Sequence, residues 1–401
     1  MSNTTKIEEL SKRLGEPGWL LSWRHAQGVH AEDFAKDEKY GIGITALEIK
    51  EDPDHASQAD YHVTPSKGLE LYTWKEALGQ EEIIPIIERL LTSGLLPKAS
   101  SREGALARAQ FQTGLVIYVQ PTLDDAGIAK EETLTLDTTI PLGSSADIVI
   151  VIIKEGARFL MKTNIQGGEE TSIFGRTVIV LLESDAKAEI ISAASGTRGF
   201  ISLEQCALVS AHSQMNWIED LNGVLRYRSR TTTLLLGEEA KSETLHTLMS
   251  TENASYDIWA GSVHQASNTY SRVYALGLAA DTSKIVYRGV VDMKKGVAKV
   301  DGAQEAKFLI VSPKAEIDAI PELDIASKEV VSSHKLSISH IRDIDLFYAK
   351  TRGIPESEAR ELAIEGFFGS LLSKIHKEEI MESVRVRIAE FTKPFHGVPL
   401  E

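Results

Sequence analysis

The stretch VIIKEGARFLMK, residues 151–162, carries the pattern on which the fold prediction depends. It contains a short apolar run, a polar turn, a small residue followed by a charged one, and a second strand-like run. The same arrangement returns in VLLESDAKAEII (180–191), LLLGEEAKSETL (234–245) and LIVSPKAEIDAI (309–320). Strand–turn–strand units without intervening helices predict an all-β region.

This repeat is a loose one. Its small-residue positions, Ala157, Ala186, Ala240 and Ala315, are unevenly spaced. Loose repetition favours the stacked coils of a β-solenoid. The pattern alone leaves a β-sandwich open as well.

Composition and periodicity change on both sides of this region. We therefore expect three parts: an N-terminal helical and mixed region at 1–104, a β core at 105–335 and a C-terminal helical domain at 336–401.

Within the N-terminal region, Lys6–Leu14 and Glu81–Leu91 have helical periodicity, and Leu95–Gly104 has the character of a linker. Pro85 is compatible with the second of these helices only in its first turn.

The change from strand to helix falls within residues 313–372. Ala315–Ile325 alternates apolar and charged residues around a break at Pro321. Ser332–His340 alternates too, so a strand there would place His334 and His340 on one face. The period then changes, because Ile344, Phe347 and Tyr348 have the i, i+3, i+4 spacing of a helix face.

A second helix is expected after Gly353, which suits a C′ position, and Pro355, which suits a first turn. Its apolar face is predicted to hold Ala359, Leu362, Ala363, Phe367 and Leu371. Gly366 and Gly369 are unfavourable inside a helix, so we expect another element, of this chain or of another chain, to approach closely there.

Composition excludes several classes of protein. The 401 residues carry a formal net charge of -15, which argues against nucleic-acid binding, because phosphate contacts need a clustered basic surface. The polar N-terminus, the absence of a long apolar run and the single cysteine, Cys206, predict a cytoplasmic protein without a membrane span or disulfides. There is no G-x-x-x-x-G-K-[ST] phosphate loop, so a partner would have to hydrolyse any ATP.

Several linked motifs near the C-terminus resemble the SufB/SufD family, the scaffold subunits of the SUF iron–sulfur assembly machinery. They are Pro321-Glu322-Leu323-Asp324-Ile325, Ser333-His334, Asp345-Leu346-Phe347-Tyr348, Thr351-Arg352-Gly353-Ile354 and Ala363-Ile364-Glu365-Gly366-Phe367. The run Gly15-Glu16-Pro17-Gly18-Trp19 through Arg24 is similar to the family's N-terminal part.

This resemblance implies a right-handed parallel β-helix core and a non-catalytic scaffold. It also implies that His334 lies at a subunit interface and contributes to a transient iron–sulfur cluster site, as a tentative iron ligand. Imidazole does replace thiolate at some cluster irons.

Departures from the family pattern limit this role. A cysteine of SufB-type chains corresponds to a place near Lys314, and the cysteine that often precedes the histidine in SufD-type chains is Ser332 here. Serine is a poor ligand for soft iron–sulfur sites. The chain therefore looks SufD-like, with the cluster shared with a cysteine-bearing partner. Cys206 is a weak candidate for sulfur relay, against the alternative of a buried small hydrophobic residue.

By the same resemblance, the C-terminal helices dock an ABC-type SUF ATPase. The candidate contacts are Phe347, Tyr348, Arg352, Phe367 and Phe368. The alternative is that these aromatic side chains cover the exposed end of the solenoid.

Two further functions remain open at this stage. The partner of the chain is either a SufB-like paralogue or a second copy of itself, as in a homodimeric scaffold of a minimal two-component system. A β-helix polysaccharide lyase is the alternative from a different class, although the core strands carry no clear aspartate cluster.

Overall fold

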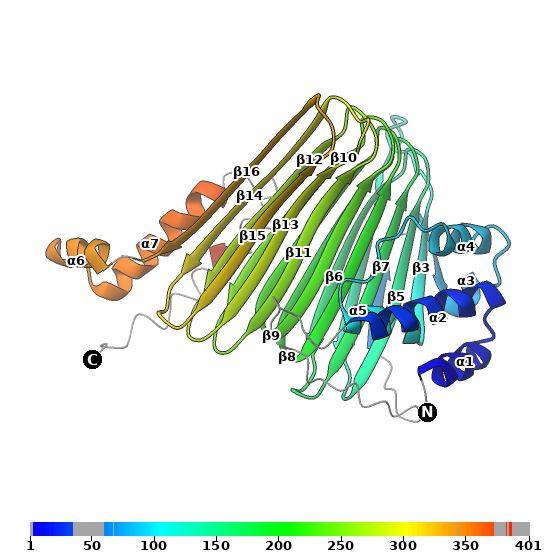
Figure 1. Cartoon of the computed structure of the whole chain (residues 1–401), viewed down its shortest axis with the longest axis horizontal. Helices are drawn as coiled ribbons and strands as arrows, with labels where there is room; N and C mark the ends of the chain where they lie inside the picture. The colour runs from blue at the N-terminus through cyan, green and yellow to red at the C-terminus, as the bar shows by residue number, and fades with distance from the viewer. Residues whose placement is uncertain are drawn as a thin grey trace.

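The computed structural model describes residues 3–34, 60–66, 68–341, 343–372, 382 and 385–386. Its centre is a β-solenoid flanked by helices from both ends of the chain (Figure 1). The coils pair in parallel throughout, which decides between the two β architectures in favour of the solenoid. The predicted mainly β fold with flanking helices is confirmed.

The coils form two parallel ladders. One ladder runs through β3 (Thr113–Val119), β5 (Ser144–Ile153), β7 (Ile173–Leu182), β11 (Ser255–His264), β13 (Lys284–Met293) and β15 (Glu316–Ile325). The other runs through β4 (Glu131–Ile140), β6 (Arg158–Gly167), β10 (Lys241–Ser250), β12 (Tyr270–Ala279), β14 (Val300–Ile310) and β16 (Val330–His340). The long strands β8 (Lys187–Val209) and β9 (Gln214–Leu235) contribute to both ladders.

The uneven spacing of the alanines has a structural cause. Ala157, Ala186 and Ala240 end turns on one side of the solenoid, and Ser213 occupies the equivalent turn between the last two. The N–H of the residue that follows the turn donates to the carbonyl of the equivalent position one coil earlier, from Lys187 to Ala157, from Gln214 to Ala186 and from Lys241 to Ser213. Ala315 ends a turn of the other series, after Ser283. The four alanines of the sequence repeat therefore come from two different series of turns, and the coil with Ser213 is missing from the first series.

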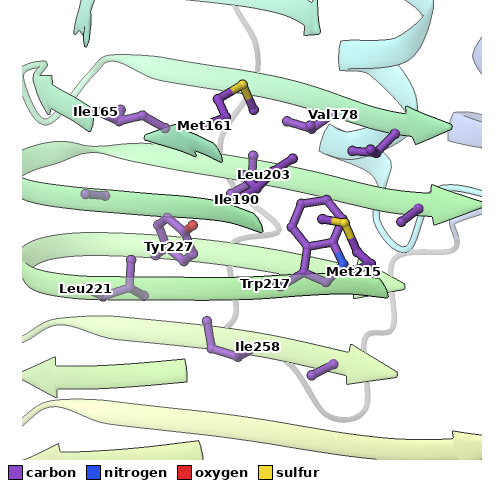
Figure 2. Packing of buried hydrophobic residues seen from close by; sticks show 14 of the residues in the cluster. Met161, Ile165, Val178, Ile190, Leu203, Met215, Trp217, Leu221, Tyr227 and Ile258 are labelled. Carbon is purple, nitrogen blue, oxygen red and sulfur yellow. The ribbon is translucent and has the colours of Figure 1, made fainter. Parts of the chain in front are cut away.

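The space between the two ladders is the main apolar core. Figure 2 shows Met161, Val178, Leu203, Trp217 and Ile258 meeting there. Alternate residues of each strand point inward, so a period of two fixes which side chains enter the core. This period also fixes which face of the last strand continues the core surface.

The N-terminal region covers the outer face of the first ladder. Its elements are α1 (Asn3–Leu14), α2 (Gly18–Asp33), β1 (Asp60–Pro65), β2 (Leu69–Thr73), α3 (Trp74–Ala77), α4 (Ile84–Thr92) and α5 (Arg102–Gln110). Leu20 and Ile87 pack in one cluster with Ile150 and Cys206.

The structure confirms the helices expected near Lys6–Leu14 and Glu81–Leu91, with Pro85 in the first turn of α4. The predicted linker at Leu95–Gly104 is wrong in its last part, because Ser101 caps α5 through a hydrogen bond from Gly104 N–H to its Oγ. Helix α5 runs across residue 104, and the division into three parts stays a prediction.

The predicted break at Pro321 is also wrong, because β15 runs through this residue. Proline lacks an N–H and is tolerated in a strand whose donor side is not paired. Strand β15 pairs with β13 alone among the described strands, so its other edge needs no donor from Pro321.

Helices α6 (Asp343–Thr351) and α7 (Glu356–Leu372) follow β16, and α6 projects beyond the solenoid (Figure 1). Ile364 and Phe368 of α7 pack on the outer face of the second ladder with Leu276 and Leu309. The buried face of α7 is therefore centred on other residues than predicted, because Ile364 and Phe368 are buried whereas the predicted Leu362 is 50% exposed.

The surroundings of two glycines in α7 differ from the prediction. A Cβ built on Gly366 or Gly369 would meet no described atom within 4 Å. The close approach predicted at these positions is not present within the described part of the chain.

Candidate functional site: the open end of the solenoid

Strands β15 and β16 form the last coil, and we call this surface the open end. Strand β15 pairs only with β13, and β16 only with β14, among the strands that the structure describes. Each strand therefore has one edge without a described neighbour. The open end also exposes large apolar side chains: Ile320, Ile325, Val331, Leu336 and Ile338, between 38% and 67% exposed.

His334 lies in the middle of this surface. It pairs in register with Gln304 of β14, and Leu336 and Ile338 pair with Ala306 and Phe308. Ala306 and Phe308 belong to the apolar core, so His334 shares the face of β16 that continues the core surface. His334 is nevertheless exposed, because no described coil stacks beyond it. The predicted strand and the shared face of His334 and His340 are confirmed.

The ligand-type residues around His334 are few. Within the described ranges, no group of three or more His, Cys, Asp or Glu side chains could hold a metal ion. His340 is six residues along the strand, roughly 20 Å away at the rise of a β-strand. Ser332 and Lys335 flank His334 closely, and Lys314 lies in the turn before β15. Within the described ranges, β16 therefore offers two imidazoles, those of His334 and His340, which are too far apart to bind one metal ion.

Cys206 lies elsewhere, on the outer face of β8 beneath the N-terminal helices. Its ladder reaches the open end through β9, β11, β13 and β15, which corresponds to about 19 Å in strand spacings. Burial raises the pKa of its thiol to about 12, against the opposing effect of the nearby Arg108 and Arg230. The structure does not bring Cys206 and His334 together within one chain.

The five aromatic and arginine positions of α6 and α7 divide by burial. Phe347 and Tyr348 of α6 are 63% and 60% exposed, and the nearby Ile344 is 62% exposed. The guanidinium of Arg352 stacks on the Tyr348 ring at 5.3 Å and donates to its hydroxyl oxygen at 3.0 Å. We call Ile344, Phe347, Tyr348 and Arg352 the α6 patch.

Phe368 is different, because only 2% of it is exposed and it packs on the sheet. Phe367 is half-buried beside it, at a centroid distance of 5.5 Å. Phe368 therefore covers an outer face of the solenoid, and not its exposed end as the alternative expectation had it.

A buried polar cluster inside the solenoid was not predicted from the sequence. Glu219 accepts hydrogen bonds from Ser229 Oγ at 2.6 Å and Gln205 Nε2 at 3.1 Å, and its carboxylate is 3.8 Å from His246 Nε2. Burial raises the pKa of Glu219 to about 7 and lowers the pKa of His246 to about 3. Glu219 and His246 are opposite each other on paired strands, and both point inward. The sequence could have predicted their contact only if the register of these strands had been known.

The fold defines a two-sided β-solenoid with a helical extension, and its exposed last coil is the candidate site. The chain matches the SUF system FeS cluster assembly SufBD core domain over residues 138–367. It belongs to this family.

Curated relatives carry the same family name. Iron-sulfur cluster assembly SufBD family proteins of Staphylococcus saprophyticus, Staphylococcus epidermidis and Staphylococcus aureus are each 23% identical over 363 residues. Each comparison covers 87% of this chain and 74% of the relative. Together with the domain match, these similarities support a role in SUF iron–sulfur cluster assembly and favour this class over the polysaccharide lyase. No helix in the described ranges is long and apolar enough to cross a membrane.

Proposed function

We propose that this chain is a non-catalytic scaffold subunit of a SUF complex, and that its open end forms half of a cluster-assembly site. The observation that carries this proposal is the position of His334. Its imidazole is exposed in the centre of an apolar surface, on a strand whose outer edge has no described neighbour. Iron and sulfide are the cargo of this site and not resident parts of the chain.

The partner at the open end is a second SufBD-type subunit. Unpaired strand edges and exposed apolar side chains are the two features that a partner strand covers when a sheet is extended across an interface. Val331, at 67% exposure, and Ile338 are unfavourable in water and gain free energy when the partner buries them.

The partner also has to complete the ligand set. His334 supplies one imidazole nitrogen, Ser332 has no thiolate, and Cys206 is buried in another part of the molecule. A cluster iron bound by His334 therefore needs cysteine ligands from the partner. This reasoning favours a cysteine-bearing, SufB-like paralogue over a second copy of this chain.

The α6 patch is the proposed contact for the ABC-type ATPase. It combines exposed aromatic rings with an arginine, which are residue types enriched at interfaces. Because α6 follows β16 directly, movement of α6 with the ATPase would act on the strand that carries His334. ATP-driven closure of the ATPase would thus alter access to the open end.

The experiment that tests the assembly is anaerobic native purification of the full chain with identification of its partners by mass spectrometry. Recovery of an ABC-type ATPase and a cysteine-bearing paralogue in one complex is the expected result. Recovery of the ATPase with this chain alone would favour the homodimeric scaffold. If no ATPase is recovered under conditions that retain other complexes, the proposed docking is wrong.

A further inference from the structure

We propose that Pro321 keeps a gap in the subunit interface beside His334, through which iron and sulfide reach the assembled site. This inference rests on the proposed association at the open end, and it adds a residue that controls access to the site. Pro321 lies in the middle of β15 and is the only proline of that strand. A proline removes a backbone donor from the strand edge toward which its N–H would have pointed.

The missing N–H of Pro321 falls on the free edge of β15. The N–H groups of Glu316 and Ala326 donate to the carbonyls of Ser283 and Met293, on the side of β13. Successive N–H groups of a strand point alternately to its two edges. The even-numbered residues of β15 therefore face β13, and Pro321 faces the edge that has no neighbour among the described strands.

Pro321 is level with His334 in the last coil. Gln304 pairs in register with His334, and its Nε2 donates to the carbonyl of Glu322 at 3.0 Å. Pro321 also lines a small cavity together with Gln304 and Leu336. The edge of β15 therefore lacks its donor at the level at which β16 carries the imidazole.

This cavity offers no route to His334 from the interior. Its volume is about 10 Å³, which is room for about one water molecule. Once a partner subunit covers the open end, the approach to His334 for iron and sulfide therefore runs across the interface.

The two free edges of the open end differ in how a partner strand can pair with them. Strand β16 contains no proline, so a partner strand can form an uninterrupted ladder along it. On β15, the pyrrolidine ring of Pro321 takes the place of a donor, and a carbonyl of a partner strand finds no N–H there. The exposed Ile320 and Ile325, on either side of this position, still favour association. The interface is therefore continuous along β16 and interrupted along β15 at Pro321.

The test compares two substitutions with opposite effects, in the anaerobically reconstituted complex of the full chain with its SufBD-type partner and ATPase. Pro321→Ala restores an N–H to the free edge, so the partner strand pairs across the gap. We expect the removal of cluster iron by bathophenanthroline disulfonate to slow about threefold or more, the size of effect expected from one hydrogen bond. Ala319→Pro removes an N–H from the same edge and should accelerate this removal by a similar factor. Pro313→Ala, in the turn before β15, is the matched control and should behave as the wild type.

Size-exclusion chromatography checks that each complex is intact. An unchanged rate of iron removal in Pro321→Ala, or a slower rate in Ala319→Pro, would overturn the inference. Loss of the complex in Pro321→Ala would overturn it too, because an added donor should not weaken strand pairing.

His334→Ala separates this inference from the proposed function. If His334→Ala lowers the cluster yield while Pro321→Ala behaves as the wild type, the site stands and only the gap is wrong. If His334→Ala leaves the yield unchanged, the proposed site fails and the inference falls with it.

Discussion

At the scale of single residues, Glu219 and His246 face each other across paired strands inside the solenoid. Burial raises the pKa of Glu219 to about 7, so the folded protein holds this proton more tightly than the unfolded chain. The stability that this proton contributes is complete below about pH 4.5 and is lost as the pH rises through about 7. His246 has the opposite dependence, because its lowered pKa makes the fold lose stability as the pH falls below about 6.5 toward 3.

We therefore predict that Glu219→Gln is more stable than the wild type at pH 8.5, by about 1–3 kcal/mol, and shows little gain at pH 5. The amide can accept from Gln205 and donate to Ser229 Oγ, so the geometry is retained. Urea unfolding at both pH values measures the difference. An equal shift at the two pH values would show that Glu219 does not carry the pH dependence.

Cys206 gives a second prediction at this scale. Because its thiol is buried and its pKa is raised to about 12, it should resist iodoacetamide in the native protein at pH 8 and react once urea unfolds the chain. Mass spectrometry of the intact protein counts the modified molecules. Rapid labelling of the native chain would return Cys206 to consideration as a sulfur relay.

Single residues also mark what the sequence could predict. The alternation around His334 was sufficient to predict its strand and its face, because a period of two is a local property. The contact of Glu219 with His246 was not predictable, because it depends on which coils are neighbours in a repeat without a fixed period.

At the scale of elements, α7 and α6 should respond differently to the loss of an aromatic ring. Phe368→Ala removes a side chain packed on the sheet and should lower the free energy of unfolding by about 3–4 kcal/mol. Phe347→Ala removes an exposed ring and should change it by less than about 0.5 kcal/mol. Chemical denaturation of both variants measures these values.

The same pair separates folding from docking. Phe347→Ala should weaken ATPase binding severalfold while its stability is unchanged, as measured by titration of the purified ATPase. Normal ATPase affinity in Phe347→Ala and in Tyr348→Ala would contradict the proposed α6 patch.

The helix faces show why elements are harder to predict than strands here. Ile344, Phe347 and Tyr348 have the spacing of a buried face, yet they are exposed. The periodicity of an apolar face is the same whether the chain itself or a partner covers it. In α7 the wrong choice of Leu362 over Ile364 arose because apolar residues occur on several sides of that helix.

At the scale of the whole molecule, the open end should govern association with the partner subunit. Val331→Lys places a charge at an exposed apolar position of β16 and should abolish the complex with the second SufBD-type subunit without destabilising the chain. Thr133→Lys is a matched control at an exposed polar position of β4, at the opposite end of the same ladder. Size-exclusion chromatography with light scattering compares them, and unchanged association in Val331→Lys would place the interface elsewhere.

The repeated strand–turn–strand unit was sufficient to predict an all-β core, because it gives the same local pattern in each coil where it occurs. It left a β-sandwich open, and the resemblance to the SufB/SufD family favoured the parallel β-helix. Two further features were not predictable from that pattern. One coil has Ser213 where the coils before and after it have alanine, and this substitution hid the period of the repeat. The free outer edges of β15 and β16 become visible only once these strands are placed beside β13 and β14.

The most direct test of the central claim is anaerobic cluster reconstitution on the complex of this chain with its cysteine-bearing partner and ATPase. We predict that His334→Ala leaves the complex assembled but lowers the yield or lifetime of the cluster at least severalfold, as measured by absorption and iron content. His340→Ala, on the same strand but distant from His334, should behave as the wild type. A wild-type yield and lifetime in His334→Ala would contradict the account, because the open end would then supply no ligand to the cluster.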